Sequence, residues 1–279
     1  MPAVYIRFPN FKIKAVTLSY DDGVRQDKRL IEIMRKHGLK GTFNINGGLF
    51  SASYNGEEKG RMTKDEALET YASSNVEVAV HGYQHFSLGA VDSALAVNDV
   101  LTDRKELEKT FGRIIKGMAY ANGSCNATAV EILKQCGISY SRTTVTTENF
   151  NLPENWLLLH PTCHHKNPRL MELAKRFVEI GTSPYYWANK PQMFYLWGHS
   201  YEFDNDGNWN VIEEFAEYIG GREEIWYATN GEIFDYVTAC ERLEFSADAS
   251  FVRNPSHLDV YIDYFGKKVV IPAGKTVAL

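Results

Sequence analysis

The chain alternates short apolar runs rich in β-formers with longer segments in which apolar residues recur at helical spacing. The short runs predict strands at residues 14–19, 41–45, 76–80, 114–119, 138–142 and 192–197. The longer segments predict helices at residues 27–37, 63–74, 92–111, 127–136, 168–180, 211–219 and 230–242. A further apolar segment at residues 156–160 continues the series. Repeated strand–helix units predict an α/β fold with a mainly parallel sheet, open or closed into a barrel.

Local signals mark several of these helix ends. Thr63 and Glu66 have the spacing of a capping box, in which each side chain bonds the other residue's backbone N–H. Gly38 and Gly137 follow two of the predicted helices, where glycine readily takes the conformation that ends a helix.

The pattern changes after Leu243. Residues 257–262 and 268–271 are rich in β-formers and flank a turn at Phe265-Gly266-Lys267, which predicts antiparallel strands. No low-complexity linker precedes them. We therefore predict a main domain over residues 1–242 and a small antiparallel β appendage over residues 243–279, packed on it. An exposed β-edge in this tail would allow the chain to form a homodimer.

Composition narrows the class of protein. The chain has 279 residues, 44% of them hydrophobic, and a net charge of −5 without blocks of like charge. This pattern indicates neither a nucleic acid nor a membrane surface as partner. The four cysteines are scattered, which favours a reducing compartment. Since the first residues lack the pattern of a signal peptide and no run is long enough to span a bilayer, we expect a cytoplasmic protein, or a secreted one if a leader was trimmed.

Two groups of polar residues follow predicted strands. Asp21-Asp22-Gly23 ends the first run, and His81 and His85, four apart, follow the run at residues 76–80. Because the ends of parallel strands converge, we expect these side chains to meet. Two imidazoles and a carboxylate form a ligand set for a divalent metal with positions left open. The second carboxylate would then be available for proton transfer.

These motifs resemble those of the polysaccharide deacetylase family, also called the NodB-homology family of carbohydrate esterases. The resemblance rests on residues 17–23, ending in Asp-Asp-Gly, and on the His-x-x-x-His pattern of residues 81–85, and covers roughly residues 12–240. It implies a distorted parallel β/α barrel with fewer than eight regular strands. It also implies that Asp21 is the general base, that Asp22, His81 and His85 hold a metal, usually zinc, and that metal-activated water removes an acetyl group from an acetylated carbohydrate.

The family's third motif, which carries Arg and Pro before a Tyr-Gly pair, is altered here. The matching residues 119–124 read Ala-Tyr-Ala-Asn-Gly-Ser, without the Arg. We expect the backbone near Asn122, beside Tyr120, to serve the oxyanion, since that role needs no particular side chain. Arg142 ends the next predicted strand, and we expect it to replace the missing Arg as the partner of Asp21.

A late motif at residues 194–199 resembles the family's final Leu-x-His pattern, whose His is the general acid. A histidine titrates near neutral pH, so His199 is suited to protonate a leaving group. Trp197, just before it, lines a sugar pocket or fills the core, and the same two interpretations apply to Trp187, Trp209 and Trp226.

The roles of several other polar residues are left open by the sequence. His160, His164 and His165 form either a second metal site or a polar, partly exposed loop, and the sequence favours the loop. Asn46 would also face the pocket. Glu202 or Asp204 would touch His199 or substrate hydroxyls.

Three functions are compatible with these features. The first is a metal-dependent deacetylase of an N- or O-acetylated carbohydrate. The second is a hydrolase of cyclic amides or other small C–N bonds on the same scaffold, which the altered third motif allows. The third is a non-catalytic carbohydrate-binding homologue, which the complete set of acid, base and ligand residues disfavours.

Overall fold

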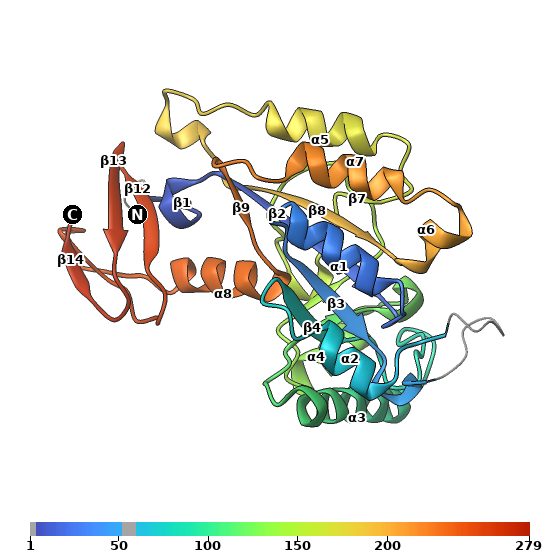
Figure 1. Ribbon diagram of the computed structural model, residues 1–279. Helices are drawn as coiled ribbons and strands as arrows, with labels where there is room; N and C mark the ends of the chain where they lie inside the picture. The colour runs from blue at the N-terminus through green and yellow to red at the C-terminus, as the bar shows by residue number, and fades with distance from the viewer. Residues whose placement is uncertain (1–3, 52–59) are drawn as a thin grey trace.

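The computed structural model describes residues 4–51 and 60–279. Its centre is a parallel sheet in the order β6-β5-β4-β3-β2-β8-β7, with β9 also paired to β2. The strands are β2 (Lys14–Asp21), β3 (Gly41–Ile45), β4 (Val76–Val80), β5 (Gly117–Ala119), β6 (Tyr140–Arg142), β7 (Cys163–His164), β8 (Gln192–Gly198) and β9 (Ile225–Tyr227). The sheet curls into a half-barrel with helices on its outside (Figure 1). The predicted distorted parallel β/α barrel is confirmed.

Eight helices are described: α1 (Asp27–Lys36), α2 (Lys64–Thr70), α3 (Ser93–Phe111), α4 (Ala127–Gln135), α5 (Leu170–Val178), α6 (Tyr201–Asn205), α7 (Asn210–Ile219) and α8 (Asn230–Glu241). Most follow the predicted segments because each buries an apolar stripe, as α1 buries Leu30, Ile31 and Met34. The capping box of Thr63 and Glu66 is present at the start of α2.

Strand β2 organises the sheet. All eight of its residues are buried, and it pairs with β3, β8 and β9. In the parallel register with β3, Asp21 lies opposite Asn44. Because neighbours in register project from the same face, this pairing brings two polar side chains together at the carboxyl end of the sheet.

The appendage consists of two antiparallel sheets. They are β1-β12-β13 and β10-β11-β14, built from β1 (Val4–Arg7), β10 (Glu244–Phe245), β11 (Phe251–Arg253), β12 (Val260–Tyr264), β13 (Lys267–Ile271) and β14 (Thr276–Ala278). Tyr236 of α8 joins it to the half-barrel by donating its hydroxyl to the Arg7 carbonyl and accepting from the Tyr261 N–H. The appendage thus includes the early strand β1, which the division at residue 242 did not anticipate.

Other local expectations differ from the structure. The strand expected at residues 114–119 begins only at Gly117, because Ile114 is 81% exposed and outside the sheet. Residues 156–158 form a 3-10 turn. Strands β7 and β9 and helix α6 were not predicted, since two to five residues are too few to show a period.

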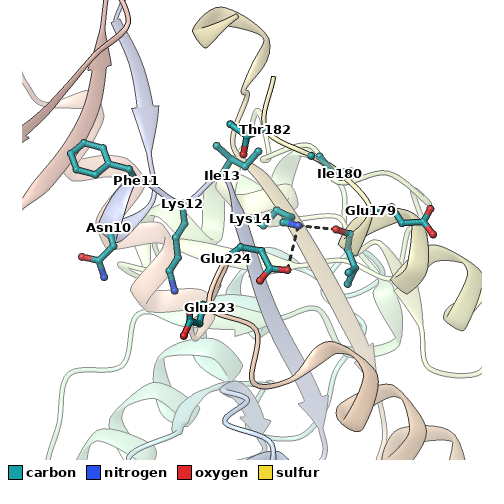
Figure 2. A pocket seen from close by; sticks show the side chains of 12 residues that line it. Asn10, Phe11, Lys12, Ile13, Lys14, Glu179, Ile180, Thr182, Glu223 and Glu224 are labelled. Atoms are coloured by element: carbon teal, nitrogen blue, oxygen red, sulfur yellow. Dashed lines mark hydrogen bonds and ion pairs between the residues drawn. The ribbon is translucent and has the colours of Figure 1, made fainter. Parts of the chain in front are cut away.

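A hollow of about 810 Å³ lies at the amino-terminal end of β2, away from the strand ends that carry Asp21 and His199 (Figure 2). Its lysines are already bonded to the protein. Lys12 donates to the Ile225 carbonyl at 2.9 Å, and Lys14 donates to the Val178 carbonyl at 2.9 Å. Although this hollow is large, its lysines are already paired with the protein, so it is not the candidate reactive site. Within the described part of the chain, no helix combines the length and apolar composition that a bilayer span needs.

Candidate active site

The carboxyl ends of four parallel strands converge on one pocket. Asp21 ends β2, His81 follows β4, Tyr120 follows β5 and His199 follows β8. The pocket has a volume of about 240 Å³. Its lining comprises Asp21, Asp22, His81, His85, Tyr120, Asn122, Gly123, Thr144, Trp197, His199 and Tyr201. The expectation that residues far apart in the sequence meet at strand ends is therefore met by the geometry.

Asp22, His81 and His85 form the first cluster with the chemistry of a metal site. One ligand atom from each lies within 4.8 Å of the other two. The Asp22 Oδ1 atom is 3.9 Å from His81 Nε2 and 3.5 Å from His85 Nε2. Neighbouring ligands of one small cation are separated by about this much, since each would lie roughly 2 Å from the ion.

Hydrogen bonding behind the rings indicates that these nitrogens are free to bind a cation. His81 Nδ1 lies 2.9 Å from the Ala119 carbonyl, which only accepts, so the proton is on Nδ1 and the Nε2 lone pair faces Asp22. Burial, and then the neighbouring His81, lower the pKa of His85 to about 4, which keeps that ring neutral at neutral pH. The residues present therefore fit a divalent metal, and nitrogen with carboxylate oxygen suits zinc.

Asp21 is held at both carboxylate oxygens. Arg142, fully buried, forms an ion pair with Oδ2, and the Asn44 amide donates to Oδ1 at 2.8 Å. Burial raises the pKa of Asp21, but the charge of Arg142 and of the nearby imidazoles outweighs it and lowers the pKa to about 2. The carboxylate is thus ionised and fixed. The contact with Arg142 is the one expected if that residue replaces the missing third-motif Arg.

His199 has a carboxylate on one side of its ring and the pocket on the other. Its Nδ1 lies 3.2 Å from Glu202 Oε2, and its Nε2 lies 3.9 Å from Asp21 Oδ2. Because a carboxylate accepts, Nδ1 donates to Glu202 and Nε2 is directed to the reacting groups. Burial lowers the pKa of His199, but the bond to Glu202 and the charges of Asp21 and Asp22 outweigh it and raise the pKa above its usual value.

His164, His165 and Glu202 form a second cluster of similar composition. The Nε2 atoms of His164 and His165 lie 3.2 and 3.3 Å from Glu202 Oε2. His164 Nδ1, however, accepts the Lys166 backbone N–H at 3.1 Å, so a neutral ring carries its proton on Nε2 and donates it to Glu202. The Lys166 ammonium lies 3.1 Å from the other oxygen. This arrangement is a hydrogen-bonded carboxylate.

The expected substrate residues line the pocket in different ways. The Arg142 guanidinium carbon lies 4.2 Å from the centre of the Trp197 ring, and Trp197 Nε1 has no partner among the described residues. Both donors of Tyr120 are engaged, its hydroxyl by the Leu157 carbonyl and its N–H by the Arg142 carbonyl. Tyr120 therefore acts as a wall of the pocket. The Asn122 side chain donates to Ser87 Oγ, so the backbone of Asn122 is the part that faces the pocket. That backbone has a φ of 56°.

Other aromatic and histidine candidates lie elsewhere. Trp209 is buried in the core, Trp187 is 50% exposed and Trp226 lines a separate hollow. His160 bonds Thr143 and lines a further hollow outside the pocket. Asn46 is buried and donates to the His81 and Gly82 carbonyls.

Several residues of the site escaped the sequence analysis. Asn44 lies opposite Asp21 in the parallel register of β2 and β3, so the pairing of the two strands identifies it as a partner of Asp21. Arg61 is buried and donates to Asp22 Oδ1 at 3.1 Å and, from Nε, to the Asp22 carbonyl. Its place at this carboxylate depends on the fold, because Arg61 precedes the predicted capping box without any motif of its own.

Comparison with known proteins agrees with the motifs. Residues 9–141 match the model of the family described as polysaccharide deacetylase, which confirms the resemblance. A putative polysaccharide deacetylase from Mycobacterium smegmatis has a TM-score of 0.59 and 16% identity, over 86% of this chain and 96% of that one. A family 4 carbohydrate esterase from Streptomyces lividans, solved with acetate, has a TM-score of 0.50 and 14% identity, over 77% and 91%.

A third similar structure is a CE4 family pseudoenzyme from Bacillus anthracis, with a TM-score of 0.51 and 17% identity, over 82% of this chain and 68% of that one. The chain spans less than two thirds of two other neighbours, 61% and 44% of their lengths. No curated protein matches the sequence. At these identities the neighbours show the fold, and a pseudoenzyme among them means that activity has to be argued from the residues of the pocket.

Proposed function

We propose that this chain, which resembles the polysaccharide deacetylase family, is a metal-dependent hydrolase that removes acetyl groups from an N- or O-acetylated carbohydrate. One observation carries the proposal: a metal-type ligand set, a fixed carboxylate and a carboxylate-paired histidine face a single pocket of about 240 Å³. A decayed homologue has no reason to retain all three together.

Asp22, His81 and His85 would hold the metal, most simply zinc. Bound there, the metal would supply Lewis acidity that polarises the acetyl carbonyl and eases loss of a proton from water. Arg61 donates to the Asp22 oxygen that faces the imidazoles and to the Asp22 carbonyl, and Asn46 donates to the His81 carbonyl. The pocket thus needs little rearrangement to bind the ion.

The two proton transfers are assigned to Asp21 and His199. Asp21 Oδ2, which faces His81 at 3.8 Å and His199 at 3.9 Å, accepts the proton of the attacking water. His199 Nε2 then donates a proton to the departing nitrogen or oxygen of the sugar, so that the acyl bond breaks and a neutral amine or alcohol leaves. Arg142 and Asn44 keep Asp21 ionised, and Glu202 orients the His199 ring and favours its protonated form, which carries a proton on Nε2.

Asp21→Asn and His81→Ala test this proposal. Acetylated chitooligosaccharides, acetylated xylan and small ureides are assayed side by side with zinc present. Asp21→Asn is expected to lower turnover by roughly 10² to 10⁴, the usual contribution of a general base, while zinc binding persists. Asp248→Asn, on the exposed surface of the appendage, is the matched control.

The outcomes separate the candidate functions. Acetate release from a sugar supports the proposal, and turnover of ureides alone would replace it with the small-amide hydrolase. Retained turnover in both Asp21→Asn and His81→Ala would refute the assignment of the site.

A further inference from the structure

The segment that carries two predicted metal ligands, residues 81–85, has an irregular backbone. Gly82 has a φ of 85° and His85 a φ of 59°. Positive φ is costly for a residue with a side chain, so such a turn persists only where its surroundings hold it. The question is therefore which groups outside the segment fix the positions of His81 and His85.

Helix α3 supplies two of them. Asp103 is fully buried; one of its oxygens accepts the Gly47 N–H, and the other accepts the His81 N–H at 3.0 Å. The His81 N–H is shared with the Ile45 carbonyl, at 3.1 Å. Because Gly47 follows β3 and His81 follows β4, a single carboxylate links the ends of two neighbouring strands.

Asp99 lies one turn earlier, on the same face of α3. Its Oδ1 accepts the Gln84 N–H at 2.8 Å, and its carbonyl accepts the Tyr83 N–H at 3.4 Å. A Cβ on Gly82 would lie 2.5 Å from Asp99 Oδ2, so the carboxylate occupies the space that any other residue at 82 would need. The two aspartates together hold the segment at both of its ends.

We propose that Asp99 and Asp103 are positioning residues that set the affinity of the metal site by holding the 81–85 segment in its ligand geometry. This inference rests on the proposed function, since it concerns the same metal. Neither carboxylate is among the ligand atoms of the Asp22–His81–His85 cluster. They act through the backbone, as outer groups that orient metal ligands commonly do.

Zinc affinity of the purified full chain tests the inference without any substrate. Asp99→Ala and Asp103→Asn are titrated with Zn²⁺ against a competing chelator. Each is expected to bind roughly 10-fold to 100-fold more weakly than wild type, the usual cost of losing an outer partner of a metal ligand. In Asp103→Asn the amide keeps the size of the carboxyl but faces one of the two backbone N–H groups with its own N–H, so it cannot accept both bonds. In Asp99→Ala the acceptor of the Gln84 N–H is gone.

Asp92→Asn is the matched control, because it removes a charge from the same helix while asparagine caps a helix as well as aspartate. Thermal midpoints in excess chelator separate positioning from stability. Midpoints close to wild type with weakened zinc binding support the inference. If Asp103→Asn does not fold, Asp99→Ala decides.

Two results would overturn the inference, and they are distinguishable. Equal zinc affinity in wild type and in folded variants would refute the positioning role of α3 and would leave the proposed function standing. Absence of zinc binding in wild type removes the metal from the proposed function and the inference with it.

Discussion

Two clusters in this molecule have nearly the same composition. Asp22 with His81 and His85, and Glu202 with His164 and His165, each place two imidazoles and one carboxylate within 4.8 Å. A search by residue type would assign a metal to both. The hydrogen bonds behind the imidazole rings separate them.

In the first cluster a carbonyl stands behind His81, so the ring nitrogen that faces the carboxylate carries a lone pair. In the second, an amide N–H stands behind His164, so the nitrogen that faces the carboxylate carries a proton. A lone pair opposite a carboxylate offers a cation two ligand atoms, whereas an N–H opposite a carboxylate is already satisfied. The backbone thus favours a metal at the first cluster and leaves the second as a hydrogen-bonded support for His199.

Zinc stoichiometry provides the sharpest test of this comparison and the largest expected effect. Wild type is expected to bind a single equivalent of Zn²⁺, measured by metal analysis after dialysis. His81→Ala should lose it, with affinity falling by more than the roughly 100-fold attributed to outer groups. His164→Ala should bind zinc as wild type does.

Two equivalents in wild type, of which His164→Ala loses one, would show that the second cluster also binds a metal. The hydrogen-bond argument would then be wrong.

A smaller effect on activity is expected when Glu202, the carboxylate of the second cluster, is replaced. In Glu202→Gln the carboxylate that raises the pKa of His199 is gone. The acid would lose its proton at a lower pH, so the alkaline limb of the pH–rate profile should move to lower pH. Turnover should fall roughly 10-fold to 100-fold, part of the 10² to 10⁴ that acid–base catalysis supplies.

Lys166→Met is the matched control for this change, since Lys166 contacts the other oxygen of Glu202 and is 40% exposed. Its pH profile should match wild type. An unshifted alkaline limb in Glu202→Gln would remove Glu202 from the acid assignment.

The sequence predicted the first cluster because its residues follow strands long enough to show a pattern. Asp21-Asp22 and His81 follow β2 and β4, which have eight and five residues. The position of Arg142 against Asp21 was expected for the same reason, because it ends the strand after the altered motif. Strand order and motif together were sufficient for these contacts.

The second cluster could not be predicted in this way. His164 belongs to the two-residue strand β7, and Glu202 lies in the five-residue helix α6, so neither element has a period to detect. The loop that the sequence favoured as partly exposed includes His165, which is only 2% exposed. The burial of an imidazole ring, and whether a donor or an acceptor bonds its far nitrogen, both depend on the tertiary structure. Asn44, Arg61 and the α3 carboxylates escaped notice for the same reason.

The smallest expected effect concerns a buried carboxyl group next to the segment that carries His199. Asp27 of α1 is fully buried and accepts hydrogen bonds from Tyr71 and from Ser200, the residue after His199. Burial raises the pKa of Asp27 to about 7, although both hydrogen bonds oppose the rise. The folded state therefore holds a proton that the unfolded chain releases near its ordinary pKa of 3.8.

The sign of the pH dependence follows from this difference. Between about pH 4 and pH 7 the folded chain binds more protons, so the contribution of Asp27 to the free energy of unfolding is complete below pH 4 and is lost as the pH rises. The linkage of about 1.4 kcal/mol per pH unit gives an upper limit of roughly 4 kcal/mol over this range.

Asp27→Asn should lack that slope, so its stability relative to wild type should rise from pH 4.5 to pH 8. Urea unfolding at several pH values measures it, with the exposed Asp65→Asn as control. Parallel pH curves for wild type and Asp27→Asn would mean that Asp27 is ionised in the folded chain, and that Ser200 and Tyr71 donate to a charge instead of a neutral carboxyl group.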